Sequence, residues 1–235
     1  MIIFYDPTID SDHPILQEEE AYHAMKVLQK KQGDVIQIVD GKGNFYQAEI
    51  NSSNYKKCEI KILEKKSTKK RNYHVHIGIA PTKNNERMEF FVEKCTEIGI
   101  DEISFLQCER SERKEIKVDR MQKIAIAAMK QSVQAYLPTL HPMKKLSTFF
   151  SEAKNETNKF IAHYQPENKN LIDHPSPFSS SLLLIGPEGD FTPNEIEQAI
   201  ENKFELVNLG NTRLRTETAG MLGCNQIHII NSKIK

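Results

Sequence analysis

Long apolar runs, paired cysteines and an excess of charge are all missing from this 235-residue sequence. The longest apolar run, IAIAAM at 124–129, is about six residues long, whereas a helix that crosses a membrane needs about 18 or more. The amino terminus lacks a basic lead, an apolar stretch and a small-residue cleavage site. We therefore expect neither a membrane span nor a secretory signal.

The cysteine pattern excludes two kinds of stabilising site. The chain has four cysteines without a C-x-x-C pair or a nearby histidine: Cys58, Cys95, Cys108 and Cys224. This spacing argues against a disulfide framework and a structural zinc site, and it suits a reducing cytoplasm. His74 and His76 share one face of an expected strand, but no third ligand lies near them in the sequence, so we expect no metal.

Charge is balanced overall and uneven locally. The chain has 32 basic and 32 acidic residues, which excludes binding of phosphate polymers by bulk charge alone. Two stretches are basic: 56–71 has eight basic residues against two acidic ones, and 110–123 has six against three. Each stretch is compatible with a solvated face and with a local nucleic-acid contact, and the charge pattern leaves both open.

The hydrophobic pattern changes near residue 72. Before it, a short helix is expected at 18–31, followed by alternating segments at 35–38, 45–50 and 58–63. Strands joined by short polar turns predict a small antiparallel barrel or sheet over 1–72. The Gly41–Gly43 segment lies between two such strands without a following helix, so it predicts a hairpin turn and not a phosphate loop.

After residue 72, strands and helices alternate. Strands are expected at 73–80, 102–106, 160–163, 181–185 and 204–209, and helices at 84–98, 118–136, 145–153 and after residues 192 and 216. This order predicts an α/β domain over 73–235, with a mostly parallel sheet covered by helices on both faces. Gly99 is expected to end the helix at 84–98.

The first of two informative loops is GPEGDF at 186–191. It follows the apolar run at 181–185, which is typical of a buried parallel strand. Thr192 and Glu195, with Pro193 between them, predict a capping box that begins a helix. Ligands of open α/β sheets bind at such strand-to-helix loops, although glycines also serve tight turns with no ligand nearby, and the pattern alone leaves both open.

The second loop, GNTRLR at 210–215, lies between the expected strand at 204–209 and a helix from about Thr216. Two arginines just before a helix amino terminus favour an anion site. Gly220 and Gly223 lie inside this helix, where each glycine costs about 1 kcal/mol relative to alanine. They indicate a close backbone approach whose partner the sequence does not identify.

Together, IGPEGDFTPNEIEQAI and VNLGNTRLRTETAG closely resemble the C-terminal signature of the RsmE-type 16S ribosomal RNA (uracil-N3)-methyltransferases of the SPOUT superfamily. The resemblance extends over nearly the whole chain through HAMKVL at 23–28, KCTEIG at 94–99, CERS at 108–111 and KQS at 130–132. The chain departs from the family pattern at Asp190, where a second glycine is common, at Gln134, where an arginine is common, and at 211–213.

The resemblance implies a PUA-like β-barrel RNA-binding domain at 1–72, followed by a SPOUT domain at 73–235 whose end is threaded into a trefoil knot. Physical reasoning alone would not give the knot, because chain connections are almost always unknotted. It further implies S-adenosylmethionine as cofactor, 16S rRNA of the small ribosomal subunit as partner, a homodimer with the active site near its interface, and a cytoplasmic location.

Individual residues are implied by position. Those expected to bind the cofactor are Leu184, Ile185, Gly186, Pro187, Glu188, Gly189, Leu209, Gly210, Leu214, Arg215, Thr216 and Thr218. Arg215 is expected to contact the uracil oxygens, and Glu217 is a proton acceptor, an orienting partner of Arg215 or a helix cap. Those expected to bind RNA are Lys26, Arg71, Arg110 and Arg113.

Other functions stay open at this point. A SPOUT enzyme acting on a ribose hydroxyl or on transfer RNA fits the same blocks, because spacing says nothing about the acceptor atom. A non-catalytic RNA-binding factor in ribosome assembly would keep the fold without transferring methyl groups. A nucleotide-binding dehydrogenase is disfavoured, since no G-x-G-x-x-G opens a helix after a strand.

Overall fold

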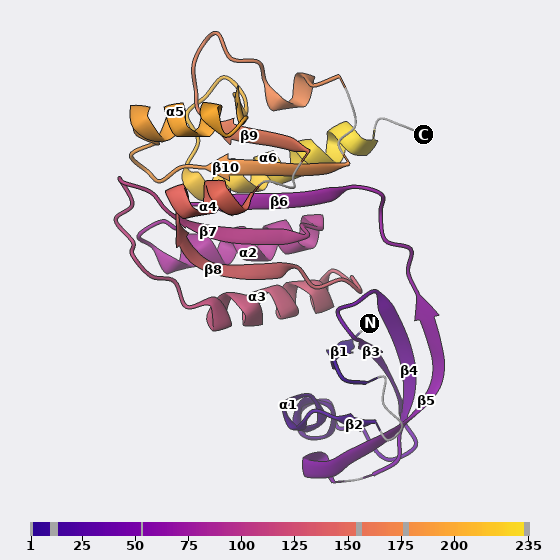
Figure 1. Cartoon of the computed structure of the whole chain (residues 1–235). Coiled ribbons are helices and arrows are strands. Elements are labelled where there is room, and N and C mark those ends of the chain that lie inside the picture. Colours follow the sequence, from indigo (N-terminus) through magenta and orange to yellow (C-terminus); the bar gives the residue numbers. More distant parts are fainter. Residues whose placement is uncertain (1, 10–13, 53, 154–156, 176–178, 233–235) are drawn as a thin grey trace. The chain divides into compact units, whose positions relative to one another are not determined.

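The computed structural model describes residues 2–9, 14–52, 54–153, 157–175 and 179–232. It divides into two compact units (Figure 1). The first unit comprises 1–70 and 126–137, and the second comprises 71–125 and 138–235. The segment 126–137 thus groups with the amino-terminal part of the chain, although the sequence placed it in the domain at 73–235. The boundary at residue 72 itself stays a prediction.

A five-stranded sheet forms the first unit, in the order β1-β3-β4-β5-β2. Its strands are β1 (Ile3–Tyr5), β2 (Ile15–Leu16), β3 (Val35–Val39), β4 (Asn44–Ile50) and β5 (Cys58–Ser67). Pairing is antiparallel between β3, β4, β5 and β2, as predicted, whereas β1 is parallel to β3. The alternating apolar residues of these strands pack one core, with Phe4, Ile38, Tyr46 and Ile50 fully buried in it.

The turn between β3 and β4 is the predicted hairpin. Gly41 and Gly43 both have positive φ, at 73° and 105°, which only glycine adopts without strain. Asp40 closes the turn by accepting hydrogen bonds from the backbone N–H groups of Lys42 at 2.8 Å and Asn44 at 3.0 Å. A side chain at Gly43 would lie 2.4 Å from the ring of Tyr136, so this glycine also permits a close contact within the unit.

The sequence predicts one helix at 18–31, but the helical segment in the structure ends at residue 27 and changes from one helix type to another. An α-helix, α1 (Glu18–Tyr22), continues as one π-helical turn, η1 (His23–Val27). The N–H of Leu28 donates to the carbonyl of His23 at 3.0 Å, five residues back. Ala21 and Ala24 are both buried in the core of the first unit. A short 3₁₀ turn, η2 (Tyr55–Lys57), lies before β5.

The second unit contains a six-stranded parallel sheet in the order β11-β9-β10-β6-β7-β8. Its strands are β6 (His74–Ile79), β7 (Glu102–Gln107), β8 (Thr139–Lys145), β9 (Asn158–Ala162), β10 (Ser180–Ile185) and β11 (Glu205–Val207). The predicted parallel sheet is confirmed. The edge strand β8 escaped prediction because its sequence, TLHPMKK, has no regular alternation and contains a proline, which a strand accommodates at an edge or a bulge.

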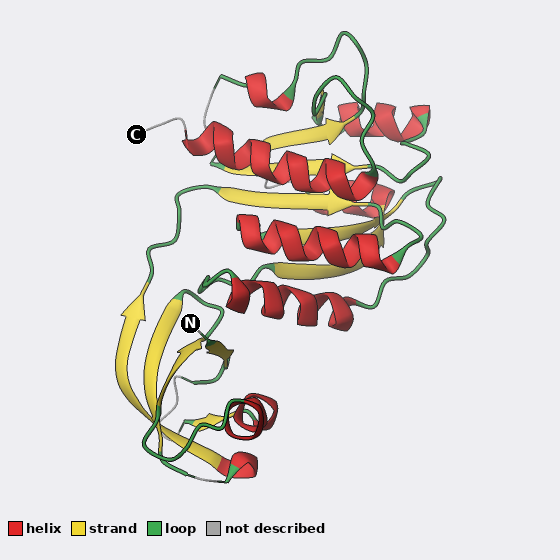
Figure 2. Ribbon diagram, turned by 180° about the vertical axis from the view of Figure 1, so that it is seen from behind, coloured by secondary structure: helices red, strands yellow, loops and turns green. Residues whose placement is uncertain are grey.

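Helices cover both faces of this sheet, with α4 (Leu146–Glu152) and α5 (Pro193–Glu201) on one face and α2 (Asn85–Ile98) and α6 (Thr216–Ser232) on the other (Figures 1 and 2). A short 3₁₀ turn, η3 (Leu171–Asp173), precedes β10. The α/β class is therefore confirmed. Among the described residues, no helix is long and apolar enough to span a membrane.

Three predicted helix boundaries can be compared with the structure. Gly99 ends α2 in the left-handed conformation, and Thr192 and Glu195 form the complete capping box of α5. The helix expected at 118–136 is too long: α3 (Val118–Gln131) ends earlier, and Val133 has a φ of +57° that no helix accommodates.

The two glycines of α6 allow the helix to approach its own neighbours in the fold. A Cβ atom at Gly220 would lie 2.5 Å from the ring of Phe91 on α2, and one at Gly223 would lie 2.2 Å from Leu183 on β10. The close approach predicted from the sequence is thus internal packing on α2 and the sheet. The threading of this segment into a knot stays a prediction.

Candidate functional site

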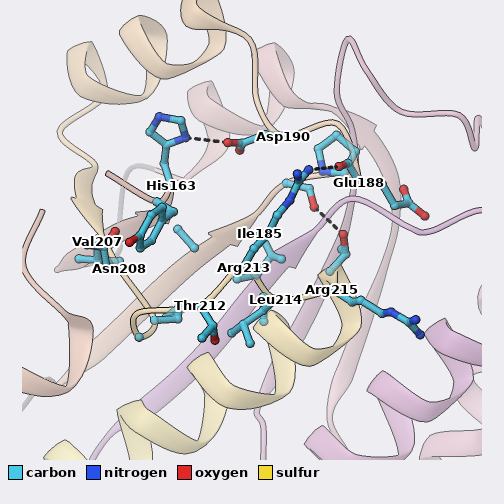
Figure 3. A pocket seen from close by; sticks show the side chains of 18 of the residues that line it. His163, Ile185, Glu188, Asp190, Val207, Asn208, Thr212, Arg213, Leu214 and Arg215 are labelled. Carbon is cyan, nitrogen blue, oxygen red and sulfur yellow. Dashed lines mark hydrogen bonds and ion pairs between the residues drawn. The ribbon is translucent and has the colours of Figure 1, made fainter. Parts of the chain in front are cut away.

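A cavity of about 610 Å³ lies at the carboxyl ends of β9, β10 and β11 (Figure 3). Two loops supply most of its lining: the 186–191 loop between β10 and α5, and the 208–215 loop between β11 and α6. A volume of this size suits a ligand of cofactor dimensions. The position is the crevice in which parallel α/β sheets bind their ligands.

The 186–191 loop contains a tight turn. The N–H of Asp190 donates to the carbonyl of Pro187 at 2.9 Å, and Asp190 has a φ of +61°. This left-handed conformation explains why the family often has glycine here, since a residue with a Cβ is strained in it. At Gly186, a Cβ would lie 3.0 Å from the ring of Phe191, so the loop also folds back on itself closely.

Asp190 forms a hydrogen-bonded pair with His163, which follows β9. Oδ2 of Asp190 lies 2.9 Å from Nδ1 of His163. The other carboxylate oxygen of Asp190 accepts a hydrogen bond from the N–H of Phe191 at 2.7 Å. Gln165 lies 3.0 Å from the other ring nitrogen of His163. The carboxylate therefore stabilises its own turn and connects it to the segment after β9. Both residues line the cavity, and Figure 3 shows the pair.

The 208–215 loop is anchored at its start by Asn208, whose side chain is buried. Its amide donates to the carbonyls of Gln165 at 2.7 Å and Asn168 at 3.0 Å and accepts the N–H of Gln165 at 3.1 Å. From α6, the side chain of Gln226 donates to the carbonyl of Leu209 at 3.2 Å. These bonds fix the backbone that leads into the cavity.

Two hydrogen bonds connect the 186–191 loop to the end of the 208–215 loop and the start of α6. The hydroxyl of Thr216, the first residue of α6, donates to the carbonyl of Gly186 at 3.2 Å, and the guanidinium of Arg213 donates to the carbonyl of Glu188 at 3.4 Å. The cavity thus lies between two parts of the chain that hydrogen bonds hold together, and Figure 3 shows the contact between Arg213 and Glu188.

Glu217 lies beside the cavity in the first turn of α6 and is buried. One carboxylate oxygen is 3.8 Å from Nε of Arg87 on α2. The other, Oε2, is buried and has no hydrogen-bond partner within the described residues. Arg215 is exposed, and its side chain extends away from Leu214 in Figure 3.

The structure brings together most of the expected cofactor residues. Those that line the cavity are Ile185, Gly186, Pro187, Glu188, Leu209, Gly210, Leu214, Arg215 and Thr216. Three do not line it: Leu184 is buried in the core, Gly189 packs against Arg110, and Thr218 lies on α6 beyond the lining. The binding role of every residue in this set stays a prediction.

Sequence reasoning missed part of the lining. The missed residues are Arg87, Ala162, His163, Tyr164, Asp190, Val207, Asn208 and Ala219. Thr212 and Arg213 also line the cavity; they belong to the predicted 210–215 loop but were not named as cofactor residues. A signal was present for those after β9: a strand was expected at 160–163, and the carboxyl ends of neighbouring parallel strands meet at one edge. Asp190 was noticed only as a departure from the family pattern.

Three of the four residues expected to bind RNA donate to their own chain. Arg71 pairs with Asp101, Arg110 donates to the carbonyl of Gly189 at 2.8 Å, and Arg113 donates to the carbonyl of Thr82 at 2.8 Å. The fourth, Lys26, is exposed, with its ammonium 5.7 Å from the centre of the Tyr55 ring. Their contact with RNA stays a prediction.

His74 and His76 surround a carboxylate on the neighbouring strand. Glu102 lies 3.5 Å from Nε2 of His74, 3.6 Å from Nδ1 of His76 and 3.2 Å from Nε2 of His141. The hydrogen bond with His74 is the largest cause that lowers the pKa of Glu102 to about 2, and burial opposes it. No group of three or more His, Cys, Asp or Glu side chains in the described ranges is arranged to hold a metal ion.

Two segments of the chain match known family models. Residues 69–228 match the family model described as RNA methyltransferase domain, and residues 16–63 match the RNA methyltransferase PUA domain. The chain therefore belongs to the RNA methyltransferase family, and its barrel is PUA-like.

Individual relatives narrow the family. A probable rRNA-methyltransferase from Porphyromonas gingivalis, known from a crystal structure, shares 36% sequence identity with this chain. The two structures superpose with a TM-score of 0.91 over 100% of both chains. Ribosomal RNA small subunit methyltransferase E from Neisseria gonorrhoeae, solved bound to S-adenosyl methionine, is 27% identical, with a TM-score of 0.87 over 97% of both chains. The curated protein of that name from Bacillus subtilis is 26% identical over 224 residues, 89% of this chain and 87% of the relative. These matches confirm the family resemblance found in the sequence.

Proposed function

We propose that this protein transfers a methyl group from S-adenosylmethionine to N3 of a specific uridine in 16S rRNA of the small ribosomal subunit. One observation carries the proposal: the cavity between the 186–191 and 208–215 loops, in a chain whose relatives include small-subunit rRNA methyltransferases, one of them solved with this cofactor. The assignment of uracil N3 as the acceptor atom is based on the family resemblance.

The residues present fit S-adenosylmethionine. Its adenine is a flat apolar ring, and Ile185, Leu209 and Leu214 give the cavity apolar walls. Its sulfonium and ammonium groups are cationic, and the carboxylates of Glu188 and Asp190 stand on the lining. When bound, the cofactor supplies an electrophilic methyl group. The protein itself would then position the cofactor and exclude water from the reacting methyl group.

The acceptor determines what the other residues must do. Uracil N3 carries a proton on the Watson–Crick edge, so the base must be unpaired or extruded before methyl transfer. As that proton leaves, negative charge builds on the uracil oxygens. Arg215, exposed at the end of the 208–215 loop, contacts and stabilises this charge. It is not the base, because a guanidinium keeps its proton in proteins.

Glu217 is the proton acceptor in this proposal. Its carboxylate is buried at the start of α6, and its Oε2 atom has no hydrogen-bond partner among the described residues. Its ion pair is with Arg87, which favours a role as acceptor over one of orienting Arg215. No cysteine nucleophile is needed for this transfer: all four cysteines are buried, and none of them lines the cavity.

We further propose that the enzyme is cytoplasmic, because its proposed substrate is ribosomal RNA. We also propose that it is a homodimer, because in the family that it resembles the active site lies near a subunit interface. Exposed apolar side chains on α2 and α6, Phe90 and Ile229, support a second copy as the partner of this face. The basic stretch 56–71 and Lys26 on η1 are proposed to contact the rRNA backbone.

The experiment that tests the function is mass spectrometry of rRNA from cells that lack this protein. The proposal expects the loss of one methyl group from one uridine of 16S rRNA, restored by the wild-type gene. Unchanged 16S rRNA would contradict it. A lost methyl on a ribose or on transfer RNA would instead assign the same fold to another acceptor.

A further inference from the structure

The segment 108–113, which follows β7, lies against the 186–191 loop. The N–H of Glu109 donates to Oε1 of Glu195 at 2.8 Å. Glu195 is the glutamate of the capping box in the first turn of α5, just after that loop. Within the segment, the N–H of Cys108 donates to the hydroxyl of Ser111 at 3.0 Å, which forms a compact turn. The segment is therefore built to face the loop.

Arg110 makes the central contact. Its Nη1 atom donates to the carbonyl of Gly189 at 2.8 Å and to the carbonyl of Phe191 at 3.4 Å. These carbonyls flank Asp190, whose φ of +61° is strained for a residue with a side chain. A Cβ at Gly189 would also lie 3.4 Å from Cβ and Cδ of Arg110, so the aliphatic stem of the arginine packs on the loop.

Arg113 makes a parallel contact on a second loop. Its Nε donates to the carbonyl of Thr82 at 2.8 Å, and its Nη2 donates to the carbonyl of Lys83. The N–H of Lys83 in turn donates to Oε1 of Glu188, in the 186–191 loop, at 3.3 Å. The segment 108–113 thus supports that loop through two arginines, one directly and one through 82–83.

We propose that Arg110 is a positioning residue for the cofactor loop and not a ligand of RNA phosphate. A strained backbone conformation persists only where its surroundings hold it, and the guanidinium holds the two carbonyls on either side of Asp190. A planar guanidinium offers five donors in a rigid fork, whereas a lysine ammonium is a point charge on a flexible stem. The inference rests on the proposed binding of S-adenosylmethionine in this cavity.

The test uses the difference between arginine and lysine. S-adenosylmethionine is titrated calorimetrically into the full-length wild type, Arg110→Ala and Arg110→Lys, and binding of an rRNA fragment is measured over a range of salt. We expect about tenfold weaker cofactor binding in Arg110→Ala, since one charged hydrogen-bonding group is lost. Arg110→Lys should show a smaller loss, because its ammonium keeps the charge but not the planar geometry of the guanidinium. The KM for the cofactor should rise with kcat at saturation nearly unchanged. Affinity for RNA and its salt slope should match the wild type.

Lys114→Ala is the matched control, because it removes an exposed charge directly after this segment. This variant should bind the cofactor like the wild type. If Arg110→Lys binds cofactor normally while Arg110→Ala loses RNA affinity and salt slope, Arg110 is a phosphate ligand and the inference is wrong. If Arg110→Ala does not fold, the cofactor and RNA affinities of Arg110→Lys alone test the inference. A wild type that binds no S-adenosylmethionine contradicts the proposed function instead.

Discussion

The hydroxyl of Thr216 donates a hydrogen bond of 3.2 Å to the backbone carbonyl of Gly186, 30 positions earlier in the chain. The bond joins the first residue of α6 to the loop after β10. Both residues line the cavity, so the bond connects two parts of its wall.

Thr216→Val keeps the shape of this side chain and removes the donor. Because a net hydrogen bond contributes about 0.5–1.5 kcal/mol, we expect affinity for S-adenosylmethionine to fall about three- to tenfold in calorimetry. Thr216→Ser retains the donor and should restore most of the affinity. Equal affinities for the valine variant and the wild type would show that the link does not shape the site.

Arg215→Ala tests the stabilisation of charge on the uracil. Since Arg215 is exposed, its loss should leave thermal stability unchanged. Removal of one donor that stabilises developing negative charge typically lowers kcat by about 10²–10³-fold. The measurement is transfer of a labelled methyl group to small-subunit rRNA from cells lacking the enzyme. Near-normal transfer would remove Arg215 from the catalytic role.

Gly220→Ala tests the close packing of α6. Alanine favours a helix over glycine by about 1 kcal/mol, but its Cβ would lie 2.5 Å from the buried ring of Phe91. Overpacking costs about 1–3 kcal/mol, so we expect a lower free energy of unfolding in urea. Asn225→Ala, on the exposed side of the same helix, should be neutral or slightly stabilising. A Gly220→Ala variant more stable than the wild type would contradict the packing.

Glu102 should make stability depend on acid pH. Its pKa falls from an ordinary 4.5 to about 2 in the folded state, chiefly through its hydrogen bond with His74. A lowered carboxylate pKa stabilises the fold above about pH 4.5, and this contribution is lost as the pH falls from 4.5 towards 2. Glu102→Gln should therefore lower the unfolding free energy near pH 6 by about 1–2 kcal/mol after solvent screening.

The same variant should flatten the pH dependence between 4.5 and 2, which denaturant titrations at several pH values measure. Glu197→Gln, an exposed carboxylate on α5, is the control and should leave the slope unchanged. If Glu102→Gln and the wild type lose stability in parallel over this range, the histidines do not stabilise the carboxylate.

The sequence predicted features of the fold that local patterns determine. The capping box at Thr192 and Glu195, the left-handed end of α2 at Gly99 and the parallel sheet all follow from residue type and spacing. The edge strand β8 was missed because its pattern is irregular, and the π-helical turn at 23–27 because nothing in its composition distinguishes it from an α-helix.

The candidate site shows the same division. Both loops were found because each follows an expected strand and precedes an expected helix. The His163–Asp190 pair and the contact of Arg110 with Gly189 were not found, because they join residues that are 27 and 79 positions apart. Contacts of this kind depend on the order of strands in the sheet, which a single sequence does not reveal.

A crystal structure of the protein with S-adenosylhomocysteine, the demethylated product, tests the central claim most directly. The account predicts ligand density between the 186–191 and 208–215 loops, with the adenine ring between Leu209 and Leu214. Empty loops, with the ligand bound elsewhere on the chain, would contradict it.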